Sequence, residues 1–239
     1  VIDPVPVVIT QNITVALDVN GNATITPQQI DNGSSSVVGL LAEGGLVLDK
    51  ATFGCSNIGV NTVKLTVTSS LGSTAFATAT VTVIDTIKPI VLVQNRTIQL
   101  DAAGNATITA DDINSGSTDN CSIATILLSK TAFDCTNFGA NTVTLTVTDV
   151  NGNGSTATAA VTVEDKIAPI VLVQNRTIQL NVAGTASITT TDINNGSTDN
   201  CGIATIVLSK TAFLTENLGA NIVTLTVTDI HGNVSSNTA

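Results

Sequence analysis

The 239-residue chain lacks Tyr, Trp and Met, and it has only five Phe and one His. Aromatic side chains are the usual stacking platform for bases and sugars, so their scarcity argues against a nucleic-acid-binding or sugar-stacking protein. Basic residues are also few, 8 against 18 acidic ones, for a net charge of −10. Nucleic acids and anionic membranes repel such a chain, and no apolar run is long enough to span a bilayer. We expect no nucleic-acid partner and no membrane insertion.

The residues that are abundant favour strands. Hydrophobic residues make up 43% of the chain, nearly all of them Val, Ile, Leu and Ala, and Thr is frequent; this composition is poor in residues that favour helix. Within residues 142–149, Val143, Leu145 and Val147 face one way and the threonines between them face the other. That period of two is typical of a half-buried strand. The Gly- and Asn-rich sequence at 151–155 predicts a hairpin turn after it.

The chain also repeats itself. Residues 89–100 recur unchanged at 169–180, a shift of 80 residues, and a more diverged copy lies upstream. The joints between copies fall near 84–89 and 164–169 and carry proline, which predicts stiff linkers. We therefore expect three domains, and their predicted bounds are 1–85, 86–165 and 166–239.

Each copy holds roughly seven short strands in about 80 residues, which indicates an all-β fold of tandem antiparallel sandwiches of the immunoglobulin type. With strands of about ten residues at ~3.3 Å each, three sandwiches in line would make an elongated rod on the order of 100 Å long. The third copy stops before the equivalents of residues 160–163, so we expect its last strand to be truncated.

Acidic residues recur at the joints. In this type of sandwich, the loop after the second strand and the loop between the last two strands lie at the end where the chain arrives. These loops carry Asp119 and Asp149, so both should meet the joint residue Asp85. Carboxylates with Asn side chains and backbone carbonyls suit Ca²⁺, and without a cation the carboxylates repel one another. The predicted calcium ligands are Asp85, Asp119 and Asp149 at the first joint, and Glu164, Asp165, Asp199 and Asp229 at the second.

The diverged first copy is an internal control. Asp119 corresponds there to Ser36, and Asp149 corresponds to Ser69, so both loop acids are missing together. A joint loss is expected if the two acids serve one site, and the start of the first copy should bind calcium weakly or not at all. The alternative interpretation is that Asp and Asn only cap turns by bonding their own backbone.

Four cysteines are present, and Cys121 and Cys135 are the only pair within one copy. We predict that they form a disulfide, which would close a 15-residue loop and stabilise the fold by about 3 kcal/mol in the chain-entropy description. Cys55 and Cys201 stand two copies apart, so we expect them to be small buried residues that do not reach each other. No Cys-x-x-Cys occurs, which argues against a zinc site.

Catalytic motifs are missing. The sequence has no phosphate loop and no nucleophile motif. The single histidine, His231, stands where the second copy has Asn151, in a predicted turn, which favours a turn residue over a catalytic base. We expect no enzyme activity.

Four motifs carry a resemblance to a known family. They are Ser-Thr-Asp-Asn-Cys-(Gly/Ser)-Ile-Ala, Leu/Phe-Gly-Ala-Asn, Val-Thr-Leu-Thr-Val-Thr-Asp-x-x-Gly-Asn and a joint of the type Glu-Asp-x-x-x-Pro. They resemble the hyalin repeat (HYR) module, closely in copies two and three and loosely in copy one. The tandem array resembles the giant surface adhesins of Bacteroidota that are exported by the type IX route and used in gliding motility. The resemblance implies an extracellular location on a bacterial cell surface and an adhesive or stalk role. Asp85-Thr86-Ile87 also fits that phylum's O-glycosylation pattern, at Thr86, although an ordinary linker threonine is an alternative.

These observations favour a structural module, a stiff spacer in a long cell-surface adhesin or surface filament, whose partners are the neighbouring repeats of the same chain. The alternative is a binding module, in which the loops or a Thr-covered sheet face grip a surface glycan or another adhesin chain. Outward Thr rows are also found on ice-binding faces, but the strand preference of threonine explains them more simply.

Overall fold

The computed structural model describes residues 4–40 and 44–239. Its contacts define two compact units. The first unit comprises Val1–Leu92, Asn114–Leu127 and Leu145–Ala157, and the second comprises Val93–Ile113, Leu128–Thr144 and Thr158–Ala239. The first copy of the repeat therefore shares a unit with one end of the second copy, and the third copy shares a unit with the other end. The division into three domains stays a prediction.

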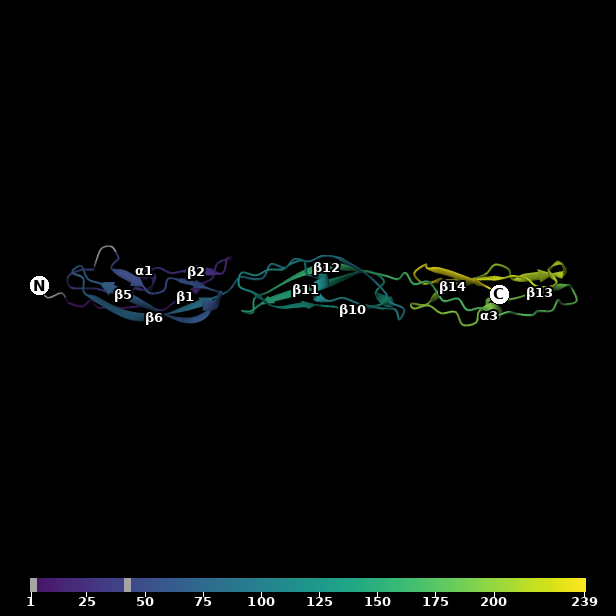
Figure 1. Ribbon diagram of the computed structural model, residues 1–239, viewed down its shortest axis with the longest axis horizontal. Helices are drawn as coiled ribbons and strands as arrows, with labels where there is room; N and C mark the ends of the chain where they lie inside the picture. Colours follow the sequence, from purple (N-terminus) through teal and green to yellow (C-terminus); the bar gives the residue numbers. More distant parts are fainter. Residues whose placement is uncertain (1–3, 41–43) are drawn as a thin grey trace. The chain divides into compact units, whose positions relative to one another are not determined.

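The first repeat builds two sheets. A four-stranded sheet has the order β1 (Ile13–Ala16), β6 (Thr74–Ile84), β5 (Gly59–Thr68), β3 (Leu46–Leu48), and β2 (Asn22–Thr24) pairs with β4 (Thr52–Gly54) in a two-stranded sheet. The two long strands β5 and β6 run side by side over their whole length (Figure 1). Two short helical turns complete the repeat, α1 (Pro27–Ile30) and the 3-10 turn η1 (Cys55–Asn57).

The second and third repeats follow the same order of elements. The second has β7 (Arg96–Gln99), β8 (Asn105–Thr107), α2 (Ala110–Ile113), β9 (Ile123–Leu128), β10 (Ala132–Asp134), η2 (Cys135–Asn137), β11 (Gly139–Asp149) and β12 (Gly154–Glu164), with the sheets β7-β12-β11-β9 and β10-β8. The third has β13 (Thr185–Ser187), α3 (Thr190–Ile193), β14 (Ile203–Leu208), β15 (Ala212–Leu214), η3 (Thr215–Asn217), β16 (Thr224–Asp229) and β17 (Val234–Thr238), with the sheets β14-β16-β17 and β13-β15.

Alternate residues of the long strands form the cores. Val143, Leu145 and Val147 of β11 are fully buried, and the threonines between them are more exposed. In the first repeat, Val63 and Leu65 occupy the equivalent inward positions and are also fully buried. Each such side chain contributes roughly 1.5–3 kcal/mol through its removal from water. The predicted all-β fold and the predicted period of two are thus confirmed.

Two pairings depart from the expected antiparallel sandwich. β1 pairs with β6 in parallel, and β7 pairs with β12 in parallel. The physical reason is the path of the chain through a repeat: the chain enters at one end and leaves at the other, so its first and last strands run in the same direction. The last strands of the first and second repeats, β6 and β12, therefore point their C-termini toward the joints that follow.

Within the described part of the chain, no helix has the length and apolar character needed to cross a bilayer.

Candidate functional site

Both disulfides of the protein connect consecutive repeats. Cys55 is bonded to Cys121, and Cys135 is bonded to Cys201; each pair has its Cα atoms 5.4 Å apart and lies 66 positions apart in sequence. The predicted Cys121–Cys135 bridge is therefore wrong, and Cys55 and Cys201, which we expected to be small buried residues, are each bonded to a cysteine of the second repeat rather than to each other. The reason is distance, because β9, with six residues, lies between Cys121 and Cys135. An extended strand of that length spans about 20 Å, whereas a disulfide needs Cα atoms within about 7 Å.

The first joint (Asp85, Asp119, Asp149 and the cystine Cys55–Cys121) lies within the first unit. Asp85 follows β6, Asp119 precedes β9, and Asp149 ends β11, and one carboxylate oxygen of each lies within 4.8 Å of the others. Asp85 and Asp149 are buried, with exposed fractions of 8% and 2%. The structure therefore brings together all three acids that the sequence predicts for this joint.

One oxygen of each loop carboxylate caps its own turn. Asp119 Oδ2 accepts hydrogen bonds from the amides of Cys121 (2.9 Å) and Ser122 (3.2 Å), and Asp149 Oδ1 accepts from the amides of Asn151 (2.9 Å) and Asn153 (2.7 Å). At the start of the first copy, Ser69 caps the equivalent turn through its hydroxyl oxygen. The turn-cap interpretation is therefore correct for these oxygens, but it leaves other oxygens of the cluster unexplained.

Three buried oxygens of the first joint have no hydrogen-bond partner among residues 4–40 and 44–239: Asp85 Oδ2, Asp119 Oδ1 and Asn120 Oδ1. Asp85 is more than nine-tenths buried. A buried carboxylate oxygen without a donor is costly, so a cation is the natural partner for this set. The residues present fit a divalent cation that prefers oxygen ligands.

The second joint (Asp165, Asp199, Asp229, His231 and the cystine Cys135–Cys201) lies within the second unit. Carboxylate oxygens of its three aspartates lie within 4.8 Å of one another. Asp165 Oδ2 forms a hydrogen bond with the Nδ1 atom of His231, at 2.9 Å. The equivalent oxygen of the first joint, Asp85 Oδ2, has no such partner among the described residues. Burial raises the pKa of the Asp165 carboxyl, but hydrogen bonds from His231, from the Asn200 side chain and from the Ile167 amide outweigh it and hold that pKa below its ordinary value.

Two predicted residues lie outside these clusters. The Glu164 carboxylate forms an ion pair with Lys166 at 2.6 Å instead of joining the aspartates of the second joint, because the next residue, Asp165, is the one that turns inward at the end of β12. Thr86 is exposed in the segment between β6 and β7, and its glycosylation stays a prediction.

Amide side chains fasten each joint, and none of them was among the predicted site residues. Asn120 donates through Nδ2 to the backbone oxygen of Asp18 in the preceding repeat (3.3 Å) and to Asp85 Oδ1 (3.2 Å). Asn200 makes the same two kinds of bond in the second joint, to the Asp101 backbone oxygen and to Asp165 Oδ1. Their recurrence at a shift of 80 residues in both closely matching copies was the signal that could have identified them.

A second pair of amides ties the linker to the hairpin turn. Asn153 Nδ2 donates to the backbone oxygen of Asp85 (3.2 Å) and to Asp149 Oδ2 (2.7 Å). Asn233 Nδ2 makes the equivalent bonds to the Asp165 backbone oxygen (3.1 Å) and to Asp229 Oδ2 (2.7 Å). Each joint thus combines a covalent bond with several hydrogen bonds between segments distant in sequence.

Glycine allows the repeats to approach closely. Gly21 and Gly104 have φ of +75° and +76°, in the left-handed region. A Cβ at Gly21 would lie 2.7 Å from the backbone oxygen of Asn120 and 2.8 Å from Cys55 Sγ, and one at Gly104 would lie 2.7 Å from Cys135 Sγ. These glycines therefore serve both the turn and its contact with the next repeat.

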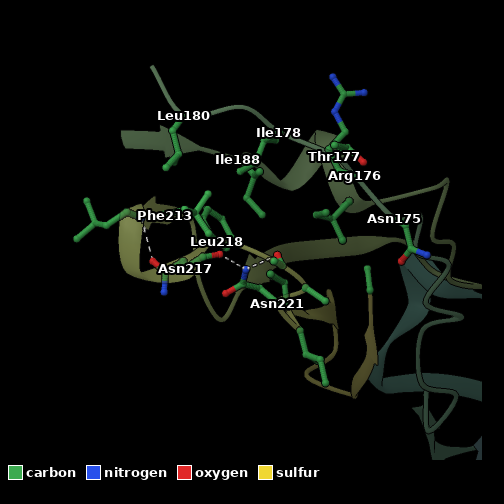
Figure 2. A pocket seen from close by; sticks show the side chains of 17 residues that line it. Asn175, Arg176, Thr177, Ile178, Leu180, Ile188, Phe213, Asn217, Leu218 and Asn221 are labelled. Atoms are coloured by element: carbon green, nitrogen blue, oxygen red, sulfur yellow. Dashed lines mark hydrogen bonds between the residues drawn. The ribbon is translucent and has the colours of Figure 1, made fainter. Parts of the chain in front are cut away.

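A groove of about 480 Å³ lies in the third repeat, away from the joints. Figure 2 shows Ile178 and Ile188 along one side of it and Leu218 and Asn221 along the other. One wall includes Arg176, Thr177 and Ile178, which correspond to Arg96, Thr97 and Ile98 of β7, and β7 pairs with β12 in the second repeat. The groove therefore corresponds to the position that the end of β12 occupies in the second repeat, and we assign it no ligand.

No family model matches the chain, and no curated protein matches it either. Solved structures do match. Protocadherin gamma B7 extracellular cadherin domains 1–4 match with 13% identity and a TM-score of 0.34, over 96% of this chain and 74% of that one. PcdhgB3 EC1–4 matches with 11% identity and a TM-score of 0.37, over 98% and 74%. Sidekick-1 immunoglobulin domains 1–5 match with 10% identity and a TM-score of 0.38, over 98% and 58%. At these values the likeness supports no conclusion about function.

Proposed function

We propose that the chain is a run of spacer repeats in the stalk of a long secreted cell-surface adhesin or surface filament, in which each joint between repeats is held stiff. The observation that supports this most is the cystine at each joint, which ties one repeat covalently to the next. A hinge requires a linker that is free to move, whereas a spacer that holds its far end away from a surface requires fastened joints. The proposal is structural and includes no enzyme activity.

The cystines also support an extracellular location, because disulfides persist in oxidising compartments. Together with the HYR-like motifs of the sequence, they favour a bacterial surface protein of the gliding-adhesin type. Its partners would be the neighbouring repeats of the same chain. Surface glycans and other adhesin chains are the alternative partners, and a glycan array in which the chain binds nothing would favour the spacer.

We further propose that calcium stiffens the joints. Asp85, Asp119 and Asp149 would hold the ion at the first joint, and Asp165, Asp199 and Asp229 would form the corresponding cluster at the second. Each cluster joins a linker residue to two loops of the following repeat. An ion bound there would neutralise the converging carboxylates and fix the linker against both loops.

Calcium should raise the melting temperature of the chain. Extracellular calcium modules bind with dissociation constants of about 0.1–1 mM, so 10 mM calcium should add roughly 1.5–3 kcal/mol to the free energy of unfolding. Titration calorimetry and scanning calorimetry, with and without a chelator, measure both effects. Asp149→Ser is the matched variant, because the hydroxyl of Ser69 already caps the equivalent turn; it should keep its fold and lose the calcium response of the first joint. If the unchanged protein takes up no calcium at 10 mM, the aspartates are turn caps only.

The spacer itself can be tested by small-angle scattering. Three repeats fastened in line should give a maximum dimension on the order of 100 Å or more, and the scattering curve should show little flexibility. Reducing the cystines in the presence of a chelator should increase the flexibility without unfolding the sandwiches. A compact envelope for the oxidised chain would contradict the proposal.

A further inference from the structure

The two joints share their aspartates and amides but differ at one turn position. The residue two places after the last aspartate is Asn151 at the first joint and His231 at the second. Asn151 is exposed, whereas the His231 side chain is only 6% exposed. A buried imidazole therefore lies beside the aspartates of the second joint, whereas the equivalent side chain at the first joint points to solvent.

At the second joint, the imidazole is fixed from two sides. Its Nδ1 atom bonds Asp165 Oδ2 at 2.9 Å. Its ring stacks on Phe138, with ring centroids 4.0 Å apart and an interplanar angle of 17°. Phe138 follows η2 in the second repeat and His231 follows β16 in the third, so the ring is also a contact between the two repeats.

The exchange of Asn151 for His231 changes the hydrogen-bond partners of the linker aspartate, which is Asp85 at the first joint and Asp165 at the second. At the first joint, Asp85 Oδ2 is buried and, across the described residues, has no hydrogen-bond donor. At the second joint, the equivalent oxygen of Asp165 is paired with His231. Within residues 4–40 and 44–239, the buried side-chain oxygens without a hydrogen-bond partner number three at the first joint and two at the second, where they are Asp199 Oδ2 and Asn200 Oδ1.

We propose that the first joint is the calcium site of this chain, and that at the second joint the His231 side chain takes the place of the ion. This inference rests on the proposed role of calcium and restricts it to one joint. Calcium prefers oxygen ligands, so an imidazole nitrogen on the linker carboxylate removes one ligand and supplies no suitable substitute. The second joint would then be fastened without a metal, by the His231–Asp165 bond and the stacking on Phe138.

Exchanging the two turn residues tests the inference. Calorimetric titration with calcium chloride should give one ion per unchanged chain. His231→Asn, which copies the first joint, should raise the number to two. Asn151→His should weaken binding at least tenfold; because the residue that corresponds to Phe138 is Ile58, the double variant with Ile58→Phe should remove it more completely.

A second measurement tests the role of His231 in the absence of calcium. In the presence of a chelator, His231→Asn should lower the melting temperature, because it removes the donor to Asp165, and calcium should then restore it. If the unchanged chain binds two ions, or if His231→Asn still binds one, the role of His231 is overturned while the calcium proposal stands. If neither the unchanged chain nor His231→Asn binds calcium, both proposals fail.

Discussion

Replacing Cys55 and Cys121 together by serine should lower the free energy of unfolding by about 4 kcal/mol. The cystine closes a loop whose ends lie 66 positions apart, and a loop of that length restricts the unfolded chain by about this amount. For sandwiches of about 80 residues, the loss corresponds to a fall in melting temperature of roughly 16–32 °C. Replacing Cys135 and Cys201 should have an equal effect, because the second loop has the same length. Scanning calorimetry measures both.

The combination of Cys55→Ser with Cys201→Ser distinguishes the observed pairing from a bridge within the second repeat. With the cystines of the structure, this double variant has no disulfide and titrates with two free thiols, at Cys121 and Cys135. It should also lose the stability of both cystines. Zero free thiols and an unchanged melting temperature would mean that Cys121 and Cys135 are bonded to each other.

Replacing Gly104 by alanine should destabilise the chain by about 3 kcal/mol. The left-handed backbone at this position costs an alanine roughly 1–2 kcal/mol. In addition, the new Cβ would lie 2.7 Å from Cys135 Sγ and 2.9 Å from the backbone oxygen of Asn200, and overpacking of this kind costs roughly 1–3 kcal/mol. Denaturant unfolding measures the total loss of stability. The rate at which a mild reductant opens Cys135–Cys201 reports on the clash of the new Cβ with Cys135 Sγ.

Gly184→Ala is the matched control. Gly184 has nearly the same φ, +74°, but among the atoms of the described residues its Cβ would approach only the side-chain methyl group Thr215 Cγ2, at 3.0 Å, and no backbone atom or sulfur. The Gly184→Ala variant should therefore lose only the roughly 1–2 kcal/mol that the left-handed backbone costs an alanine. The rate at which Cys135–Cys201 is reduced should not change. Equal losses for Gly104→Ala and Gly184→Ala would show that the close approach of the repeats contributes nothing to stability.

The strands were predictable because their information is local. Val143, Leu145 and Val147 alternate with threonine, and that pattern alone determines which side chains face the core. The approach of Asp119 and Asp149 to Asp85 was also predictable, because strand direction determines at which end of a sandwich a loop lies. The first prediction required one strand only, and the second required only the linker and the repeat that follows it.

The features that could not be predicted depend on contacts between repeats. Cys55 and Cys121 belong to different copies. To pair them, one must know that Cys55 lies at the end of the first folded sandwich that faces the second repeat, and that Cys121 lies at the facing end of the second sandwich. The partner of His231 is likewise a residue 66 positions away, at the end of the preceding repeat. Strand periodicity carries no information about such contacts, although the repetition of each cysteine at a shift of 80 residues was a signal.

The cystines also determine which part of the backbone would carry tension. When the ends of the chain are pulled, force passes from Cys55 to Cys121 through the sulfur atoms, and again from Cys135 to Cys201. The residues inside each closed loop, including the long strands β5, β6, β11 and β12, are bypassed. Because it is closed by a disulfide, each loop keeps about 230 Å of backbone from being extended. Between the cystines, only the segment from Cys121 to Cys135 would bear the load, so under force the second repeat could lengthen by no more than this short span until a disulfide is reduced.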